Sequence, residues 1–181
     1  MNETDRALTD PACTTFGLLR HGQTEWNRLK KIQGSCNSPL SQSGREQVAL
    51  WASTLLQFQW HRVLASDLGR VQETVEIINK SLGIPVTYDQ RLREQSWGEW
   101  EGLTIPFIKE NFSEDLARRV NMGWEFSAPG GETRTAVKSR VEEALFDADT
   151  NWPGQNILLV CHQGVIKATL YHLTAREFLP G

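Results

Sequence analysis

The sequence predicts an α/β fold of three layers, α/β/α, in which helices cover both faces of a mainly parallel central sheet. Two observations favour this fold. Short apolar runs, each long enough for one buried strand, alternate along the chain with segments in which apolar residues recur at helical spacing. Such an alternation of strands and helices is typical of parallel sheets. The 181 residues suit one domain with a small insert.

The first strand is predicted at residues 14–19, the apolar run "TTFGLL". A long loop follows it. The next helix is expected from Ser43 onward, because Ser43 and Glu46 have the spacing of a capping box. The apolar residues behind this box share one helical face: Val48, Trp51, Ala52 and Leu55. The run "HRVLASD", residues 61–67, predicts the second strand.

A second long helix is predicted after that strand. Apolar residues recur at helical spacing from Val71 onward, and Gly83 ends the helix. The third strand is expected at residues 84–89, "IPVTYD". Residues 94–131 are irregular and contain Trp, Gly and Pro, so we expect a small insert there, with short helices near 104–122.

The last third of the chain repeats the pattern of helix, strand and helix. The turn sequence "APGGET" precedes a helix whose inner face holds Val137, Val141, Ala144 and Leu145. Residues 156–162, "NILLVCH", predict the fourth strand, and residues 164–175 a final helix. Residues 1–13 are predicted to be a flexible N-terminal tail, which leaves 14–181 as a single domain.

Composition excludes several classes of partner. The net charge of -3 argues against a nucleic-acid partner, which usually meets a basic stripe. The longest apolar run has five residues, and the N-terminus has no apolar segment of the signal-peptide kind, so we expect no membrane partner. Cys13, Cys36 and Cys161 show no metal-binding spacing. Their sparse, odd count fits reduced thiols and a cytoplasmic protein.

Polar side chains stand where three of the predicted strands end. Arg20 and His21 follow the first strand, Arg70 comes shortly after the second, and His162 ends the fourth. If the strands are adjacent and parallel, these residues gather at one sheet edge, where ligands of open α/β sheets bind. Guanidinium groups bind phosphate oxygens through two N–H groups, and a neutral imidazole can attack phosphorus. The site therefore predicts phosphate chemistry.

A metal site or a nucleotide site of the P-loop type fits this edge less well. Two histidines would need a third ligand and a carboxylate, and the flanking arginines would repel a cation. We therefore expect no metal. The sequence also lacks the GxxxxGK[ST] pattern of a P-loop.

The motifs of this chain resemble those of the histidine phosphatase superfamily, the phosphoglycerate-mutase-like proteins. "LLRHGQTEWN" resembles the signature of that family. The supporting motifs follow in the family's order over about residues 14–174: "QGSCNSPLSQSG", "SDLGRVQETV", "LREQSWGEWEG", "PGGET" and "VCHQG". Any one of them is weak, whereas the ordered set is specific. The resemblance implies the phosphoglycerate-mutase-like version of the predicted fold.

The resemblance also implies a role for each matched residue. His21 matches the nucleophile that becomes phosphohistidine, and Glu94 the carboxylate that protonates the leaving oxygen and then helps to activate water. Gln33 and Gly34 match positions beside the leaving group, and Asn27 matches an asparagine that supports the phosphate site. Three residues match the phosphate-binding ring: Arg20, Arg70 and His162. No cofactor is implied.

Simpler interpretations remain open for some of these residues. Arg70 could pair with Asp67 or Glu73 on its own helix. Glu94 has two nearby rivals for the role of the acid, Glu99 and Glu101.

The sequence departs from the family pattern at several positions. Gln163 stands where the family usually has glycine, so its side chain is expected to narrow the phosphate pocket or contact the substrate. Asn37 replaces a frequent aspartate, and asparagine can still form a turn. Trp97 is expected to form an apolar wall near Glu94 that raises the pKa of this acid. Relatives usually add a strand after the last helix. Without it, an exposed edge strand allows a homodimer.

The function implied is that of a histidine acid-type phosphatase, which hydrolyses a small phosphorylated metabolite through phosphohistidine. Three alternatives remain. A cofactor-dependent phosphoglycerate mutase would have a lysine where this chain has Ile105, although Arg118 and Arg119 could hold a substrate carboxylate. A protein phosphohistidine phosphatase of the short type would lack an extended segment such as 94–131. A non-catalytic binding module would not need the full set of matched residues.

Overall fold

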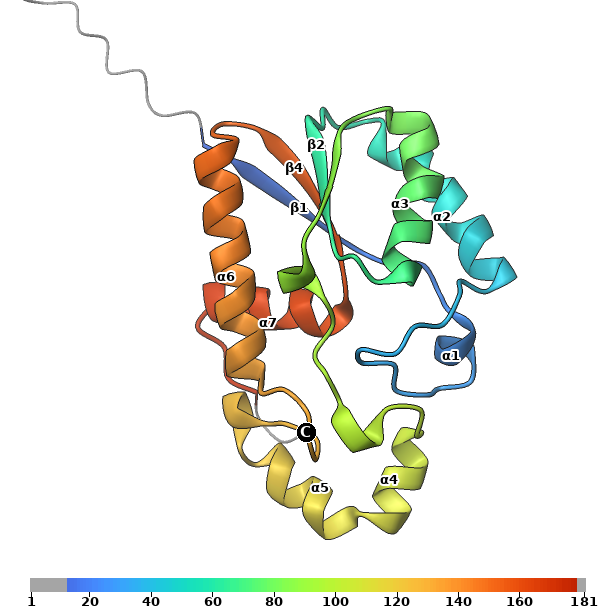
Figure 1. Cartoon of the computed structure of the whole chain (residues 1–181), viewed down its shortest axis with the longest axis vertical. Helices are drawn as coiled ribbons and strands as arrows, with labels where there is room; N and C mark the ends of the chain where they lie inside the picture. Colours follow the sequence, from blue (N-terminus) through green and yellow to red (C-terminus); the bar gives the residue numbers. More distant parts are fainter. Residues whose placement is uncertain (1–12, 179–181) are drawn as a thin grey trace, which may run out of the picture.

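The computed structural model describes residues 13–178, and within them the chain forms one sheet of four parallel strands between helices (Figure 1). The strands are β1 (Thr15–Arg20), β2 (Arg62–Ala65), β3 (Val86–Tyr88) and β4 (Asn156–Cys161). Their order across the sheet is β1-β4-β2-β3. The predicted α/β/α fold is therefore confirmed, and the first, second and fourth predicted strands are neighbours.

Strand β4 lies at the centre of the sheet and aligns its neighbours. Leu159 of β4 is paired with Leu18 of β1 on one side and with Leu64 of β2 on the other. The pairing continues to the strand ends, where Arg20 is opposite Cys161. Because the strands are parallel and in this register, the residues that follow β1, β2 and β4 emerge at the same edge of the sheet.

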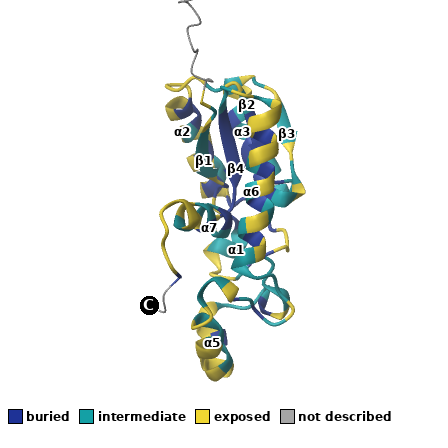
Figure 2. Ribbon diagram, turned by 90° about the vertical axis from the view of Figure 1, so that its left-hand side faces the viewer, coloured by how far each residue is buried: buried dark blue, intermediate teal, exposed yellow. Residues whose placement is uncertain are grey.

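Each face of the sheet is covered by a pair of helices, and the buried strand β4 lies between them (Figure 2). The side chains of β4 point alternately toward the two faces. Helices α2 (Gln42–Leu55) and α3 (Gly69–Leu82) pack against Leu158 and Val160. Helices α6 (Arg134–Asn151) and α7 (Gln163–Leu173) pack against Ile157, Leu159 and Cys161. These β4 side chains are almost completely buried, so most of the apolar core is built around this one strand.

The predicted insert forms a separate apolar cluster beyond the carboxyl edge of the sheet (Figure 1). Its helices are α4 (Ile105–Asn111) and α5 (Ser113–Val120), as expected near residues 104–122. Single turns of 3₁₀ helix lie at Gln90–Leu92, Gly98–Trp100 and Gly123–Glu125. The buried residues of the cluster are Trp100, Ile108, Phe126 and Ala128.

Two local predictions need correction. Helix α2 begins at Gln42, and its N-cap is Ser41, whose hydroxyl accepts from the Gly44 N–H. The capping box predicted at Ser43 is therefore wrong. Contacts with the preceding loop hold Ser41 at the cap: its N–H donates to the Gln23 carbonyl oxygen at 2.8 Å, and its hydroxyl contacts the same residue.

The loop predicted after Gly22 contains a single-turn helix, α1 (Glu25–Arg28). A capping box holds it: the Thr24 hydroxyl accepts from the Asn27 N–H, and the Asn27 side chain accepts from the Thr24 N–H. The usual sequence rule for a capping box requires Glu or Gln at the third helical position. Asn27 stands there instead, so the rule did not predict α1.

Some predictions fall outside what the structure tests. Of the predicted tail 1–13, only Cys13 belongs to the described residues. Within residues 13–178, β1 pairs on one side only, and the homodimer stays a prediction. No helix of the described part is long and apolar enough to cross a membrane.

Leu159→Ala should lower the free energy of unfolding by about 2–5 kcal/mol, because Leu159 is fully buried at the centre of the sheet. Urea denaturation measures this change. Leu50→Ala is the matched control, since the Leu50 side chain is 73% exposed and its loss should cost little. Equal effects of the two variants would contradict the central place of β4 in the core.

Candidate active site

The parallel ladder brings two histidine rings together at the carboxyl edge of the sheet. The His21 N–H donates to the Cys161 carbonyl oxygen at 3.1 Å, which extends the β1–β4 pairing by one residue. His162 follows β4 directly as the N-cap of α7. The two ring centroids are 5.2 Å apart. Both side chains are almost completely buried.

His21 is held in one tautomer. Its Nδ1 lies 2.7 Å from the carbonyl oxygen of Gly22, and a carbonyl can only accept, so Nδ1 carries the proton. Nε2 then has a free lone pair. Burial lowers the pKa of His21 to about 3, and the positive charges of Arg70 and Arg20 act in the same direction. The ring is therefore neutral near neutral pH, as a nucleophile must be.

His162 has one occupied and one unpartnered ring nitrogen. Its Nε2 lies 2.9 Å from the Ser66 hydroxyl, and Ser66 is the residue that follows β2. Its Nδ1 is buried and has no hydrogen-bond partner in the described part of the chain. Burial lowers the pKa of His162 well below its usual value, with Arg70 as the next contributor. A buried polar atom without a partner is costly and is typical of a site that receives a ligand.

Arg70 lies on the first turn of α3 with its side chain buried. Two of its nitrogens hold the loop that follows α1: Nη1 donates to the Cys36 carbonyl at 2.7 Å and Nη2 to the Gly34 carbonyl at 2.8 Å. Its Nε is buried and unpartnered among residues 13–178. Burial lowers the pKa of Arg70 to about 10.

The simpler interpretation of Arg70, a pair with a carboxylate of its own helix region, does not apply. Asp67 binds Arg93 through two hydrogen bonds. Glu73 binds Arg45 at 2.6 Å and accepts from the Leu40 N–H. Both carboxylates are therefore occupied elsewhere.

Arg20, His21 and Asn27 line a cavity of about 500 Å³ together with Gln23, Gln47 and Trp51. The Arg20 side chain is exposed. The Oδ1 atom of Asn27 is used in the cap of α1. Asn27 thus has a clear structural role and also borders this cavity.

Glu94 approaches from the segment that leaves the sheet after β3. One carboxylate oxygen accepts from the Gln95 N–H at 2.9 Å and the other from the Gly164 N–H at 3.2 Å. A side chain at Gly164 would displace the Glu94 carboxylate, because a Cβ there would lie 2.3 Å from Glu94 Oε1. Burial raises the pKa of Glu94, although both N–H groups and the arginines oppose it. A raised pKa favours the protonated form that a general acid needs.

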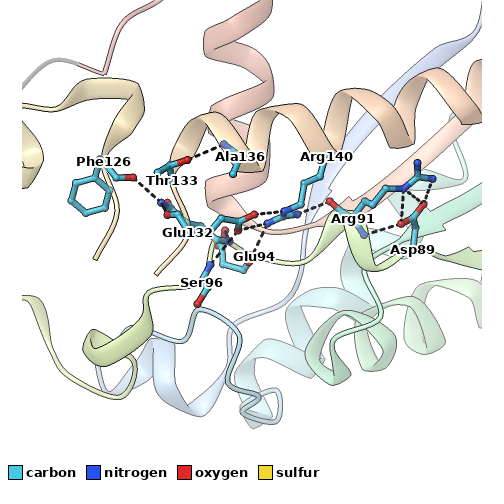
Figure 3. A network of polar contacts seen from close by, with 10 residues as sticks. Asp89, Arg91, Glu94, Ser96, Phe126, Glu132, Thr133, Ala136 and Arg140 are labelled. Carbon is cyan, nitrogen blue, oxygen red and sulfur yellow. Dashed lines mark hydrogen bonds and ion pairs between the residues drawn. The ribbon is translucent and has the colours of Figure 1, made fainter. Parts of the chain in front are cut away.

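An ion pair between Arg140 of α6 and Glu132, which precedes this helix, fixes the backbone around Glu94 (Figure 3). Arg140 binds both carboxylate oxygens of Glu132, at 2.7 and 2.9 Å. The same guanidinium donates to the carbonyl oxygens of Arg91 and Glu94. The Gln95 side chain adds a hydrogen bond to the Glu132 carbonyl at 2.7 Å. Sequence reasoning missed Arg140, although Glu132 lies within the quoted "PGGET" motif.

Glu99 and Glu101, the two rivals of Glu94, differ from it. Glu99 is exposed. Glu101 accepts from the N–H groups of Ser35 at 2.7 Å and Trp97 at 3.0 Å. Burial alone would raise its pKa, but these hydrogen bonds outweigh burial and keep the pKa of Glu101 below the usual value. Glu101 thus joins two loops through its hydrogen bonds, whereas burial raises the pKa of Glu94.

Gln33 and Gly34 lie in the loop that Arg70 and Glu101 hold. Gly34 has a positive φ of 51°, and a Cβ there would lie 2.0 Å from Glu101 Oε1. Its position is therefore set by packing as well as by the turn. Gln33 is buried, and its Oε1 has no partner in the described part of the chain.

Trp97 and Gln163 do not line the His21 cavity. They line a second cavity of about 300 Å³ that includes Glu94 and Gly164. The Trp97 ring packs edge-on against Phe126 with centroids 5.3 Å apart, which joins it to the apolar cluster of the insert.

A comparison of the sequence with models of protein families identifies the family of this chain. The model of the histidine phosphatase superfamily (branch 1) matches residues 16–179. The chain belongs to the histidine phosphatase superfamily. The family resemblance expected from the ordered motifs is thus confirmed.

Several superfamily members are similar over most of their length. The protein named "Probable phosphoglycerate mutase GpmB" of Salmonella choleraesuis is 34% identical over 161 residues, 87% of this chain and 75% of that protein. The structure of Bacillus stearothermophilus YhfR has a TM-score of 0.82 and 30% identity, covering 91% of this chain and 81% of YhfR. Mycobacterial glucosyl-3-phosphoglycerate phosphatase has a TM-score of 0.78 and 32% identity, covering 86% and 79%.

The side chains gathered at this edge are mainly nitrogen groups. Residues 13–178 contain no group of three or more His, Cys, Asp or Glu side chains arranged to hold a metal ion. The edge instead gathers Arg70, Arg20 and the two neutral histidines.

The free energy of unfolding should fall as the pH is lowered from 7 to 4, and His21 should account for part of the fall. Below pH 6.5, the ordinary histidine pKa, His21 is protonated in the unfolded chain. In the folded protein it stays neutral down to its lowered pKa of about 3. Each such group costs about 1.4 kcal/mol per pH unit in that window. Above pH 6.5 the contribution vanishes.

Urea denaturation at several pH values, in the wild type and in His21→Asn, measures this contribution. The asparagine does not titrate, and its amide can still donate to the Gly22 carbonyl. The variant should therefore lose stability less steeply below pH 6.5. An unchanged pH dependence would show that His21 does not resist protonation.

Proposed function

We propose that the chain is a phosphomonoester hydrolase that acts through a phosphohistidine at His21, without a metal ion, on a small phosphorylated metabolite. One observation carries the proposal: a neutral His21 with a free Nε2 lies beside His162 and Arg70, and Glu94 with a raised pKa lies at the same edge. Two of the similar structures are phosphatases and support the proposal: mycobacterial glucosyl-3-phosphoglycerate phosphatase and the α-ribazole phosphatase from Shigella flexneri.

The phosphoryl group is held by atoms that have no partner in the described part of the chain. Arg70 Nε and His162 Nδ1 are buried and unpartnered, and Arg20 borders the His21 cavity. A bound phosphate dianion would give each of them a strong charge-assisted hydrogen bond. Its negative charge also favours protonation of His162, so that both ring nitrogens can donate. These donors stabilise the charge on the equatorial oxygens in the transition state.

The first step forms one bond and breaks one. His21 Nε2 attacks phosphorus, the P–O bond to the leaving group breaks, and protonated Glu94 gives its proton to the leaving oxygen. The products are the released alcohol, phosphohistidine and ionised Glu94. The N–H groups of Gln95 and Gly164 stabilise the carboxylate formed in this step.

The second step regenerates the enzyme. Water attacks the phosphorus of phosphohistidine, ionised Glu94 takes a proton from that water, and the N–P bond breaks. Inorganic phosphate leaves, and both His21 and Glu94 return to their starting protonation states. The Gly22 carbonyl accepts from the Nδ1–H throughout and keeps the ring in place.

The mutase activity named in the similar Salmonella proteins has less support from the residues of this chain. Arg118 and Arg119, which could have held a substrate carboxylate, both bind Asp115. Arg119 also donates to the Ser127 carbonyl. Ile105, at the position where the mutases have a lysine, is the first residue of α4.

Glu94→Gln should slow phosphoryl transfer from alkyl esters far more than from p-nitrophenyl phosphate. The variant cannot supply a proton, and only the alkoxide leaving group needs one. The expected loss for an alkyl ester is about 10²–10⁴-fold. Burst and steady-state rates for one aryl and one alkyl ester, in wild type and variant, measure it. An equal loss for both esters in the burst phase would mean that Glu94 is not the leaving-group acid.

His21→Ala should abolish the phosphoenzyme, because it removes the nucleophile while leaving Arg70 and His162 in place. Rapid quenching with a radiolabelled ester, followed by detection of acid-labile, base-stable label on the protein, measures it. His61→Ala is the control, because His61 is exposed and lies at the start of β2, at the opposite end of the sheet. Label retained in His21→Ala would assign the covalent step to another residue.

Hydrolysis of p-nitrophenyl phosphate should persist in EDTA. The proposed mechanism uses only side chains, and cationic groups occupy the positions around the phosphate. The rate with and without chelator, and after addition of Mg²⁺ or Zn²⁺, measures this. Loss of activity in EDTA with recovery on adding a divalent ion would contradict the metal-independent mechanism.

A further inference from the structure

The cavity beside Glu94 holds two cationic side chains that the mechanism does not use. It has a volume of about 300 Å³, and its wall joins Glu94 and Gly164 to Arg134 of α6 and Lys167 of α7. Trp97 and Phe178 supply aromatic walls. The cavity is therefore continuous with the proposed acid and combines positive charge with aromatic surface.

Arg134 is a partly buried cation without a carboxylate. Its guanidinium lies between two rings, 4.3 Å from the centroid of Phe126 and 4.1 Å from that of Phe178. One N–H donates to the Gly123 carbonyl at 2.9 Å. Within residues 13–178 it forms no ion pair, whereas Arg140 on the same helix binds Glu132. Burial lowers the pKa of Arg134 to about 10, as expected of a desolvated and uncompensated charge.

Lys167 lies one helical turn after Gly164, on the same wall of the cavity. Its ammonium group is 5.0 Å from the ring centroids of both Tyr171 and Phe178. It forms no ion pair with any described residue, and its side chain is exposed. Phe178 thus contacts both cations, and Arg134 and Lys167 line the same cavity.

The direction from which His21 attacks phosphorus determines which part of the substrate enters the 300 Å³ cavity. In phosphoryl transfer the attacking and leaving atoms lie roughly in line on opposite sides of phosphorus. His21 lines the 500 Å³ cavity, and Glu94 lines the 300 Å³ cavity. The group that departs with the help of Glu94 therefore extends into the cavity of Arg134 and Lys167.

We propose that the preferred substrates carry a second anionic group, a carboxylate or a phosphate, on the leaving group, and that Arg134 and Lys167 bind it while Trp97 and Phe178 contact the carbon skeleton. This inference rests on the proposed phosphatase function and adds the chemical class of the leaving group. A guanidinium fork and an ammonium suit an oxyanion, and the aromatic walls suit a planar or apolar linker.

Three aryl esters of similar shape test the inference: 4-carboxyphenyl, 4-phosphonophenyl and 4-carbamoylphenyl phosphate. The carbamoyl ester is the neutral match of the carboxylate. The wild type should show a kcat/KM at least about tenfold higher for one or both anionic esters, as expected of charge-assisted hydrogen bonds. The larger of the two preferences identifies whether carboxylate or phosphate is bound.

The variants Arg134→Gln and Lys167→Gln should each reduce this preference by about tenfold, mainly through KM. Lys138→Gln is the matched control, because Lys138 is a cation on the same helix as Arg134 but does not line this cavity. This variant should prefer the anionic esters as strongly as the wild type does. Circular dichroism checks folding. If Arg134→Gln does not fold, Lys167→Gln, which changes an exposed side chain, still decides the outcome.

Hydrolysis of all three esters without preference for the anionic ones overturns this inference and leaves the phosphatase function intact. A preference that survives both cavity variants, or that Lys138→Gln abolishes equally, also overturns it. If no ester is hydrolysed and no phosphoenzyme forms, the proposed function itself fails, and this inference with it.

Discussion

The parallel pairing of β4 with β1 and β2 is the constraint on which the rest of the structure depends. It places His21, Ser66 and His162 one residue beyond three neighbouring strands. The Ser66 N–H donates to the Val160 carbonyl, as the His21 N–H does to that of Cys161, so the ladder itself fixes the spacing of the site. A slip of one residue would turn every β4 side chain to the opposite face, where it would pack against the other pair of helices, and would separate His162 from His21. Core packing and site geometry are therefore specified together.

The candidate active site lowers the stability of the folded protein, and the apolar core offsets this loss. Buried polar atoms of Arg70, His162 and Gln33 have no partner among the described residues, and such atoms lower stability. The surrounding hydrogen bonds limit this cost and fix the geometry: Arg70 holds the carbonyls of Gly34 and Cys36, and Ser66 holds His162. A site held in this way is preorganised, which is the condition that the proposed electrostatic catalysis requires.

Two carboxylates near the site show how environment divides their roles. Glu94 and Glu101 each accept backbone N–H groups, yet the pKa of Glu94 lies above its usual value and that of Glu101 below. Burial is the largest effect on both pKa values, but at Glu101 the combined hydrogen bonds, including those from Ser35 and Trp97, outweigh it. One can therefore act as an acid, while the other joins the loop of Gly34 to the insert. The cavity beyond Glu94, with Arg134 and Lys167, extends this arrangement toward the leaving group.

The sequence by itself determined the layers of the fold, the order of helices and strands, and the histidines and arginines at the strand ends, because hydrophobic periodicity and ordered motifs are local properties. It misplaced the cap of α2 and missed α1, since Ser41 and Asn27 are selected by contacts with distant residues such as Gln23 and by a capping variant outside the usual rule. Only the tertiary structure decided which carboxylate has the raised pKa, that a side chain at Gly164 would displace Glu94, and that Arg134 and Lys167 share a cavity with Glu94. Burial, close approach and uncompensated charge depend on residues far apart in the chain, and no local pattern encodes them.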